Sequence, residues 1–135
     1  MPQPLVHIDY IARQKQRDVL LIEFHNTETG VKLDYTLNPA RKKIIEWFTA
    51  SDIPPYECGG YASETRLDSY RGQIYIDVPY DKTDPVFRKV ETYLENPGGS
   101  MKFDGAWFCY FPLDVCMRNA HHDLPGFWEY LLEKL

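Results

Sequence analysis

One short stretch of the sequence is apolar almost without interruption. Residues 19–24 read VLLIEF, and only one of the six side chains is charged. A strand with one face in water alternates apolar and polar residues, whereas a strand buried on both faces is continuously apolar. We therefore predict a strand over residues 19–25 that occupies a central position in a sheet.

The segments before and after this run predict an antiparallel arrangement. Apolar residues alternate with polar ones over 5–12 and again over 31–37, which is typical of half-buried strands. The connections at 13–18 and 26–30 are too short for a crossover between parallel strands. We therefore expect these two strands and the one at 19–25 to form a meander.

Two dipeptides that contain proline predict the main helices. Asn38 precedes Pro39, and Asp84 precedes Pro85. A short polar side chain caps a helix N-terminus, and proline fits the first turn. We therefore expect helices over 39–50 and 85–95. The residues expected to pack on the inner face of the sheet are Trp47, Phe48, Phe87, Val90 and Leu94.

The remaining segments are assigned from their turn residues and periodicity. Prolines and glycines mark 51–63 as irregular. Residues 64–78 are interpreted as a hairpin, with a short helix over 64–70 as the alternative for its first half. A last strand is expected over 101–111, followed by helices over 113–120 and from 125 onward. The last helix is expected to cover an end or face of the sheet through Phe127, Trp128, Leu131 and Leu132.

The length of the chain limits the number of domains. With 135 residues and 15.9 kDa, two domains would each have too little core. We predict a single α+β domain over residues 1–135. Its sheet is expected to be mostly antiparallel, with five or six strands, two main helices and a C-terminal helical pair.

Charge and cysteine content limit the classes of partner and the cellular compartment that we expect. A net charge of −5 and a pI near 5.3 disfavour the basic face that nucleic acid requires, so we expect no nucleic-acid partner. The N-terminal residues lack the pattern of a secretory signal, and no apolar run reaches the roughly 18 residues of a membrane span. The three cysteines include no CxxC motif, which indicates reduced thiols in a cytoplasmic protein.

A catalytic thiol paired with histidine is one hypothesis for a site. Such a nucleophile needs a base within reach, and no sequence motif names one. Cys58 lies next to Glu57, which would raise the thiol pKa, and Cys109 lies in an aromatic run that predicts burial. The candidate catalytic residues are Cys58, Cys116, His121 and His122.

The same C-terminal region offers an alternative metal site. Cys116, His121, His122 and Asp123 carry the thiolate, imidazole and carboxylate groups that Zn²⁺ accepts. Adjacent histidines and the lack of an HExxH motif favour instead a structural corner, in which Asp123 caps the last helix. We therefore predict no metal and no cofactor, with this group of four residues as the alternative.

A third candidate surface is basic and aromatic. Arg41, Lys42 and Lys43 lie in the first turn or so of a predicted helix, where the helix dipole disfavours cations. The arrangement indicates either a solvated face or an anion site at the helix N-terminus. Tyr56 and Tyr61, in the irregular stretch that follows, are candidates for contact with a ligand or partner.

The composition favours binding over catalysis. Aromatic residues make up 15% of the chain, with ten tyrosines, and tyrosine suits interfaces. We expect a small cytoplasmic protein-binding or regulatory domain without catalytic activity, which binds a protein partner or associates with itself. The alternative is a small enzyme or ligand-binding domain with a Cys/His-lined pocket between residues 51–63 and the corner at His121 and His122.

Overall fold

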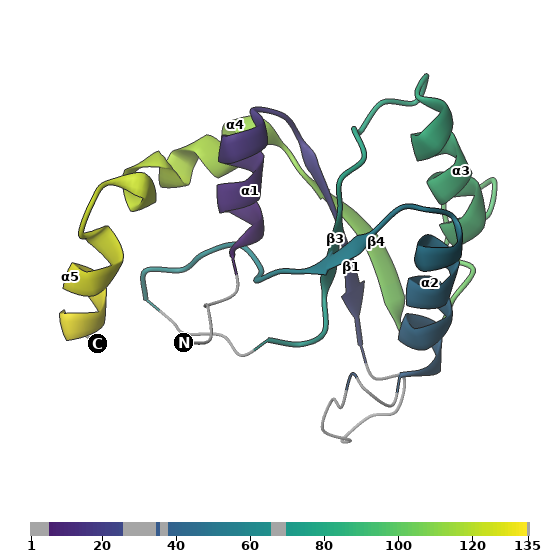
Figure 1. Cartoon of the computed structure of the whole chain (residues 1–135), viewed down its shortest axis with the longest axis horizontal. Helices are drawn as coiled ribbons and strands as arrows, with labels where there is room; N and C mark the ends of the chain where they lie inside the picture. Colours follow the sequence, from purple (N-terminus) through teal and green to yellow (C-terminus); the bar gives the residue numbers. More distant parts are fainter. Residues whose placement is uncertain (1–5, 26–34, 36–37, 66–69, 135) are drawn as a thin grey trace.

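The computed structural model places a four-stranded antiparallel sheet between helices (Figure 1), and we describe residues 6–25, 35, 38–65 and 70–134. The α+β class with an antiparallel sheet is as predicted. In chain order the elements are α1 (Ile8–Lys15), β1 (Val19–Phe24), α2 (Pro39–Ala50), β2 (Pro55–Glu57), β3 (Ile74–Ile76), α3 (Pro85–Leu94), β4 (Ala106–Phe111), α4 (Leu113–Cys116), the 3-10 helix η2 (Met117–Asp123) and α5 (Phe127–Lys134).

The strand order is β2-β3-β1-β4, so β1 has a neighbour on each side. It pairs with β4 along six residues and with β3 along three, both antiparallel. The central position predicted for residues 19–25 is therefore confirmed. β4 and β2 form the two edges of the sheet.

The apolar run of β1 contributes to two separate cores. Leu20, Ile22 and Phe24 face a core shared with α2 and α3, while Val19 and Leu21 face a core shared with α1. Figure 1 shows the corresponding layers, with α1 and α4 on one side of the sheet and α2 and α3 on the other. Burial on both faces explains why the strand contains almost no polar residue.

Both main helices begin where their caps predict. The Asn38 side chain accepts a hydrogen bond from the Arg41 amide at 3.0 Å, and the Asp84 side chain accepts from two amides at 2.9 Å. Each helix then turns a set of apolar residues toward the sheet. Of the residues expected to pack there, Phe48, Phe87, Val90 and Leu94 are fully buried and Trp47 is partly buried.

The strand predicted over 5–12 is wrong, because residues 8–15 form α1. Ile8 and Ala12 are four residues apart and are both completely buried, as one face of a helix requires. Asp9 and Arg13 have the same spacing and form a buried ion pair. Over so few residues, alternation also places apolar groups four apart, so the pattern fits both structures.

The prediction of five or six strands and two main helices is also wrong. The described residues contain four strands and five α-helices. β2 lies within the stretch expected to be irregular, and it pairs with β3. The strand predicted at 31–37 and part of the predicted hairpin, residues 66–69, lie outside the described residues apart from Tyr35. β4 begins at Ala106 rather than 101.

The last helix does not cover the sheet as predicted. α5 contacts η2, none of its residues is buried, and Leu132 is 58% exposed. Figure 1 shows α5 at the far end of the molecule from α2 and α3. No helix within the described ranges is both long enough and apolar enough to cross a membrane.

Candidate functional site

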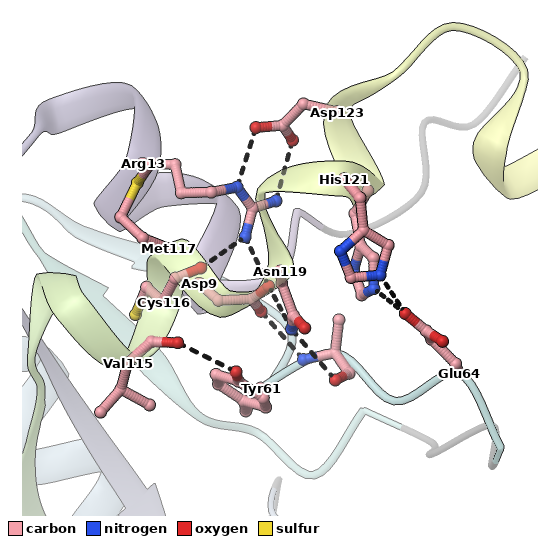
Figure 2. A network of polar contacts seen from close by, with 12 residues as sticks. Asp9, Arg13, Tyr61, Glu64, Val115, Cys116, Met117, Asn119, His121 and Asp123 are labelled. Carbon is pink, nitrogen blue, oxygen red and sulfur yellow. Dashed lines mark hydrogen bonds and ion pairs between the residues drawn. The ribbon is translucent and has the colours of Figure 1, made fainter.

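Arg13 lies at the centre of a polar network that joins α1 to η2 (Figure 2). Its Nη1 donates to Asp9 Oδ2 at 2.8 Å and to the Cys116 carbonyl at 3.2 Å. Its Nε and Nη2 donate to the two carboxylate oxygens of Asp123, each at 2.8 Å. The guanidinium therefore neutralises a buried carboxylate and anchors η2 at the same time.

Asp9 extends this network to a third segment of the chain. Its Oδ1 accepts from the Ala62 amide at 2.9 Å, and its Oδ2 also accepts from Asn119 Nδ2 at 3.0 Å. Asn119 donates in turn to the Ala62 carbonyl at 3.4 Å. One fully buried carboxylate thus ties together α1, η2 and the segment around residue 62.

The hydrogen bonds to Asp9 also decide its charge. Burial alone would raise the pKa of Asp9, but donation from Arg13, Asn119 and the Ala62 amide outweighs burial and lowers it below the ordinary value of 3.8. The carboxylate is therefore ionised in the folded protein at neutral pH.

Acidification should remove the stabilisation that this carboxylate provides. A group with a lowered folded-state pKa stabilises fully above its unfolded pKa, and the stabilisation is lost as the pH falls through the folded value. We expect the free energy of unfolding to fall more steeply in the wild type than in Asp9→Asn as the pH decreases below about 4. Urea unfolding at several pH values measures both slopes, and equal slopes would contradict the prediction.

Beside this network, two adjacent histidines converge on one carboxylate. His122 Nε2 lies 2.8 Å from Glu64 Oε1, and His121 Nε2 contacts the same oxygen. Figure 2 shows the Glu64 side chain pointing toward His121. Hydrogen bonds from His121 and then His122 lower the pKa of Glu64, so this group is also ionised. We call Glu64, His121 and His122 the histidine cluster.

Aromatic rings surround the buried member of the histidine cluster. His122 is 2% exposed and stacks on Phe127 with ring centroids 4.5 Å apart. Trp128 packs edge-on against the same imidazole, and His7 stacks on Trp128. The first turn of α5 therefore forms the wall of this corner rather than a layer over the sheet.

The structure does not bring the predicted catalytic cysteines to these histidines. Cys58 and Cys116 are completely buried in the core beneath α1. Burial raises the pKa of Cys58 to about 12, and the pKa of both Cys109 and Cys116 to about 11. These thiols are therefore protonated at neutral pH, which is the unreactive form.

Of the four residues in the alternative metal site, the structure brings together only His121 and His122. Asp123 is held by Arg13, and Cys116 lies in the core. The third group beside His121 and His122 is Glu64, which the sequence analysis did not select. No local spacing could have identified it, because it lies 57 residues before His121.

The basic and aromatic residues predicted to bind a ligand or partner do not form one site either. Arg41 donates to the Gly72 carbonyl at 2.9 Å, and its guanidinium lies 4.9 Å from the Tyr35 ring centroid. Tyr61 donates to the Val115 carbonyl at 3.1 Å. Both side chains therefore have structural partners. Lys42, Lys43 and Tyr56 are exposed.

The outer edge of β4 is a surface that the sequence analysis missed. His25 donates its amide to Gly105, which places the hydrogen-bonded pairs with β1 at every second residue, including 107, 109 and 111. The backbone groups of Ala106, Phe108 and Tyr110 therefore point away from β1. Within the described ranges, no other segment donates to or accepts from them.

A groove runs beside this edge, on the side of the sheet that carries α3. Its volume is about 600 Å³. It is lined by Phe108 and Tyr110 of β4, by Phe87 and Glu91 of α3, and by residues 96–99. The groove therefore combines an unpaired strand edge with apolar and charged side chains.

The described part of the chain thus presents two arrangements suited to binding, the histidine cluster and the outer edge of β4. They lie on opposite sides of the sheet, because η2 packs on α1 and the groove lies along α3. Comparison of the chain with protein-family models, with curated proteins and with solved structures found no match.

Proposed function

We propose that the protein is a non-enzymatic binding domain that captures an extended segment of a partner protein beside β4. The observation that carries this proposal is the row of outward backbone groups on Ala106, Phe108 and Tyr110. Unpaired N–H and C=O groups at a sheet edge are a template for another strand. Main-chain hydrogen bonds supply affinity in this mode of recognition, and side-chain pockets supply specificity.

The two edges of the sheet differ in a way that supports the proposal. Natural sheets protect their edges with short strands, proline and charged residues. β2 has all three features, since it has three residues, begins at Pro55 and ends at Glu57. β4 has six residues, AWFCYF, with neither a charge nor a proline. The edge at β2 is therefore protected against pairing, and the edge at β4 is open to it.

The side chains around β4 suit a protein partner. Trp107 is 59% exposed and Tyr110 is 48% exposed, and both residue types are enriched at the centres of interfaces. In an added strand, alternate side chains would point into the groove along α3. The charged groups at the rim of the groove, including Glu91 and Lys102, are of both signs.

A single extended segment fits this surface better than a second copy of the chain. The groove is bounded by α3 and by residues 96–99, so an added strand would bring only side chains into it. A second copy paired through β4 would bring its own α3 to the same side of the sheet. Self-association is therefore the competing outcome of the experiment.

The substitution Tyr110→Pro should weaken capture while leaving the fold intact. The Tyr110 amide points outward, so proline removes a donor to the partner without removing a hydrogen bond to β1. Cys109 before it is already extended, as the residue before a proline must be. The matched control is Tyr110→Ala, which loses the same ring and keeps the amide.

The probe is a phage-displayed library of random linear dodecapeptides, selected on the wild-type protein. We expect the selected peptides to bind wild type and Tyr110→Ala and to lose at least about tenfold in affinity for Tyr110→Pro, the loss of roughly one net hydrogen bond and its geometry. Fluorescence anisotropy of the synthetic peptides measures this. Amide exchange by NMR should slow at Ala106, Phe108 and Tyr110 in the complex.

Two outcomes would contradict the proposal. Peptides that bind Tyr110→Pro as tightly as wild type would place the binding surface elsewhere. If the free protein is a dimer by sedimentation, and the amides of Ala106, Phe108 and Tyr110 are already protected in it, the edge is occupied by a second copy.

A further inference from the structure

We propose that Glu64, His121 and His122 bind one Zn²⁺ ion. One ring nitrogen from each histidine and a carboxylate oxygen of Glu64 lie within 4.8 Å of one another. Donors around a tetrahedral Zn²⁺ ion lie about 3.4 Å apart, as bond lengths of about 2.0–2.2 Å require. His122 Nε2 lies 2.8 Å from Glu64 Oε1, so the exposed Glu64 side chain would move outward to make room for an ion.

The donor set selects the class of ion. Two imidazoles and one carboxylate are ligands that zinc accepts, and zinc sites with three protein ligands keep a further position open. Mg²⁺ and Ca²⁺ prefer oxygen ligands, and only one of these three donors is oxygen. His121 and Glu64 are exposed, so the open position faces solvent.

Both histidines direct their Nε2 atom at the same carboxylate oxygen of Glu64. The two rings meet edge-on, with centroids 4.5 Å apart and planes at 78°. Each Nε2 contacts Oε1 of Glu64 rather than one oxygen each. Both Nε2 atoms thus converge on one carboxylate oxygen, and an ion bound by all three groups would replace these two contacts with bonds from nitrogen and oxygen to the metal.

The ring of His122 is fixed in place by its neighbours. Its side chain is completely buried, stacks on Phe127 and meets Trp128 edge-on. One of the three ligands is therefore held in a single orientation before an ion arrives.

The buried network holds the ligands in position before an ion arrives. Asp9 accepts from the Ala62 amide two residues before Glu64, and it accepts from Asn119 two residues before His121. Arg13 holds Asp123 directly after His122. The two segments that carry the ligands are therefore fixed to the same carboxylate, which gives the preorganisation that a metal site requires.

The experiment is calorimetric titration of ZnCl₂ into the full chain, purified without an affinity tag and treated with a chelator. We expect one Zn²⁺ per chain in the wild type. Glu64→Gln and His121→Ala should each weaken binding by at least the roughly 10–100-fold that loss of an outer-shell partner causes. Co²⁺ loaded in place of Zn²⁺ should give the absorption of a site with nitrogen ligands, and MgCl₂ should give no binding.

A matched control comes from a second histidine–carboxylate pair on the surface. His25 Nε2 lies 3.8 Å from Glu23 Oε2, and both side chains are exposed, but no second histidine joins them. His25→Ala should leave Zn²⁺ binding unchanged. His121 and Glu64 are exposed, so their variants are expected to fold, and circular dichroism checks this.

The proposal is overturned if the wild type binds no Zn²⁺, or if Glu64→Gln and His121→Ala bind it as tightly as the wild type does. It is also overturned if His25→Ala weakens binding as much as they do. The cluster lies on the α1 side of the sheet and the β4 groove on the α3 side, so this result is independent of peptide capture.

Discussion

Replacing Arg13 with methionine should lower the free energy of unfolding by about 3–5 kcal/mol. Methionine keeps much of the side-chain volume but leaves Asp9 buried without its cation. Asp9 is completely buried and the Arg13 side chain is 4% exposed, so water cannot replace the lost contacts. Urea unfolding followed by circular dichroism at neutral pH measures the change.

A surface ion pair provides the control for this substitution. Arg17 pairs with Asp77, and these side chains are 34% and 44% exposed. Arg17→Met should therefore cost no more than about 1 kcal/mol. In the double variant Asp9→Asn, Arg13→Met, the loss should be smaller than the sum of the two single losses, because no fully buried charge is left unpaired. If Arg13→Met and Arg17→Met lowered the free energy of unfolding equally, the prediction would be contradicted, because the buried ion pair would then contribute no more than the exposed one.

The substitution Phe48→Ala should also destabilise the protein by about 3–5 kcal/mol. Phe48 is completely buried between α2 and the sheet, where its ring belongs to the larger of the two cores. Deleting the ring leaves a cavity that a closely packed core can refill only in part. The midpoint and slope of urea unfolding give the change in the free energy of unfolding.

An exposed aromatic residue on another helix is the control for Phe48. Tyr130 in α5 is 59% exposed, so Tyr130→Ala removes a ring of similar size with little change in burial. We expect this variant to stay within about 0.5 kcal/mol of the wild type. If Tyr130→Ala lowered the free energy of unfolding as much as Phe48→Ala does, Tyr130 would have to be buried in solution, which would contradict its exposure in the structure.

The parts of the fold that could be predicted are those with local physical causes. The caps at Asn38 and Asp84 determine where α2 and α3 begin, and proline at the next position reinforces each start. The continuous apolar run in β1 reflects burial on both faces, which requires a central strand. In each case the information lies within a few neighbouring residues.

The errors arise where distant residues decide the outcome. α1 is helical because Asp9 and Arg13 find partners in Ala62, Asn119 and Asp123, none of which is near in sequence. α5 was expected over the sheet because its apolar residues are typical of a covering helix. The bond between Arg13 and Asp123 instead anchors the chain beside α1 before α5 begins.

The candidate sites were predictable to different extents. His121 and His122 could be selected from the sequence, but Glu64 could not, because only the fold brings it to them. The exposed edge of β4 depends on the strand order, which follows from pairing between residues far apart. The aromatic run in β4 could be recognised in the sequence, but the position of this strand at an edge of the sheet could not.

The contact between Arg13 and Asp123 also constrains the order in which parts of the protein can fold during synthesis. These residues are 110 positions apart, so α1 leaves the ribosome long before its partner is synthesised. Until then Asp9 and Arg13 lack Asn119 and Asp123, and their half of the molecule cannot close. The α1 side must therefore complete its folding late, whereas β1, β3 and α3 are available earlier.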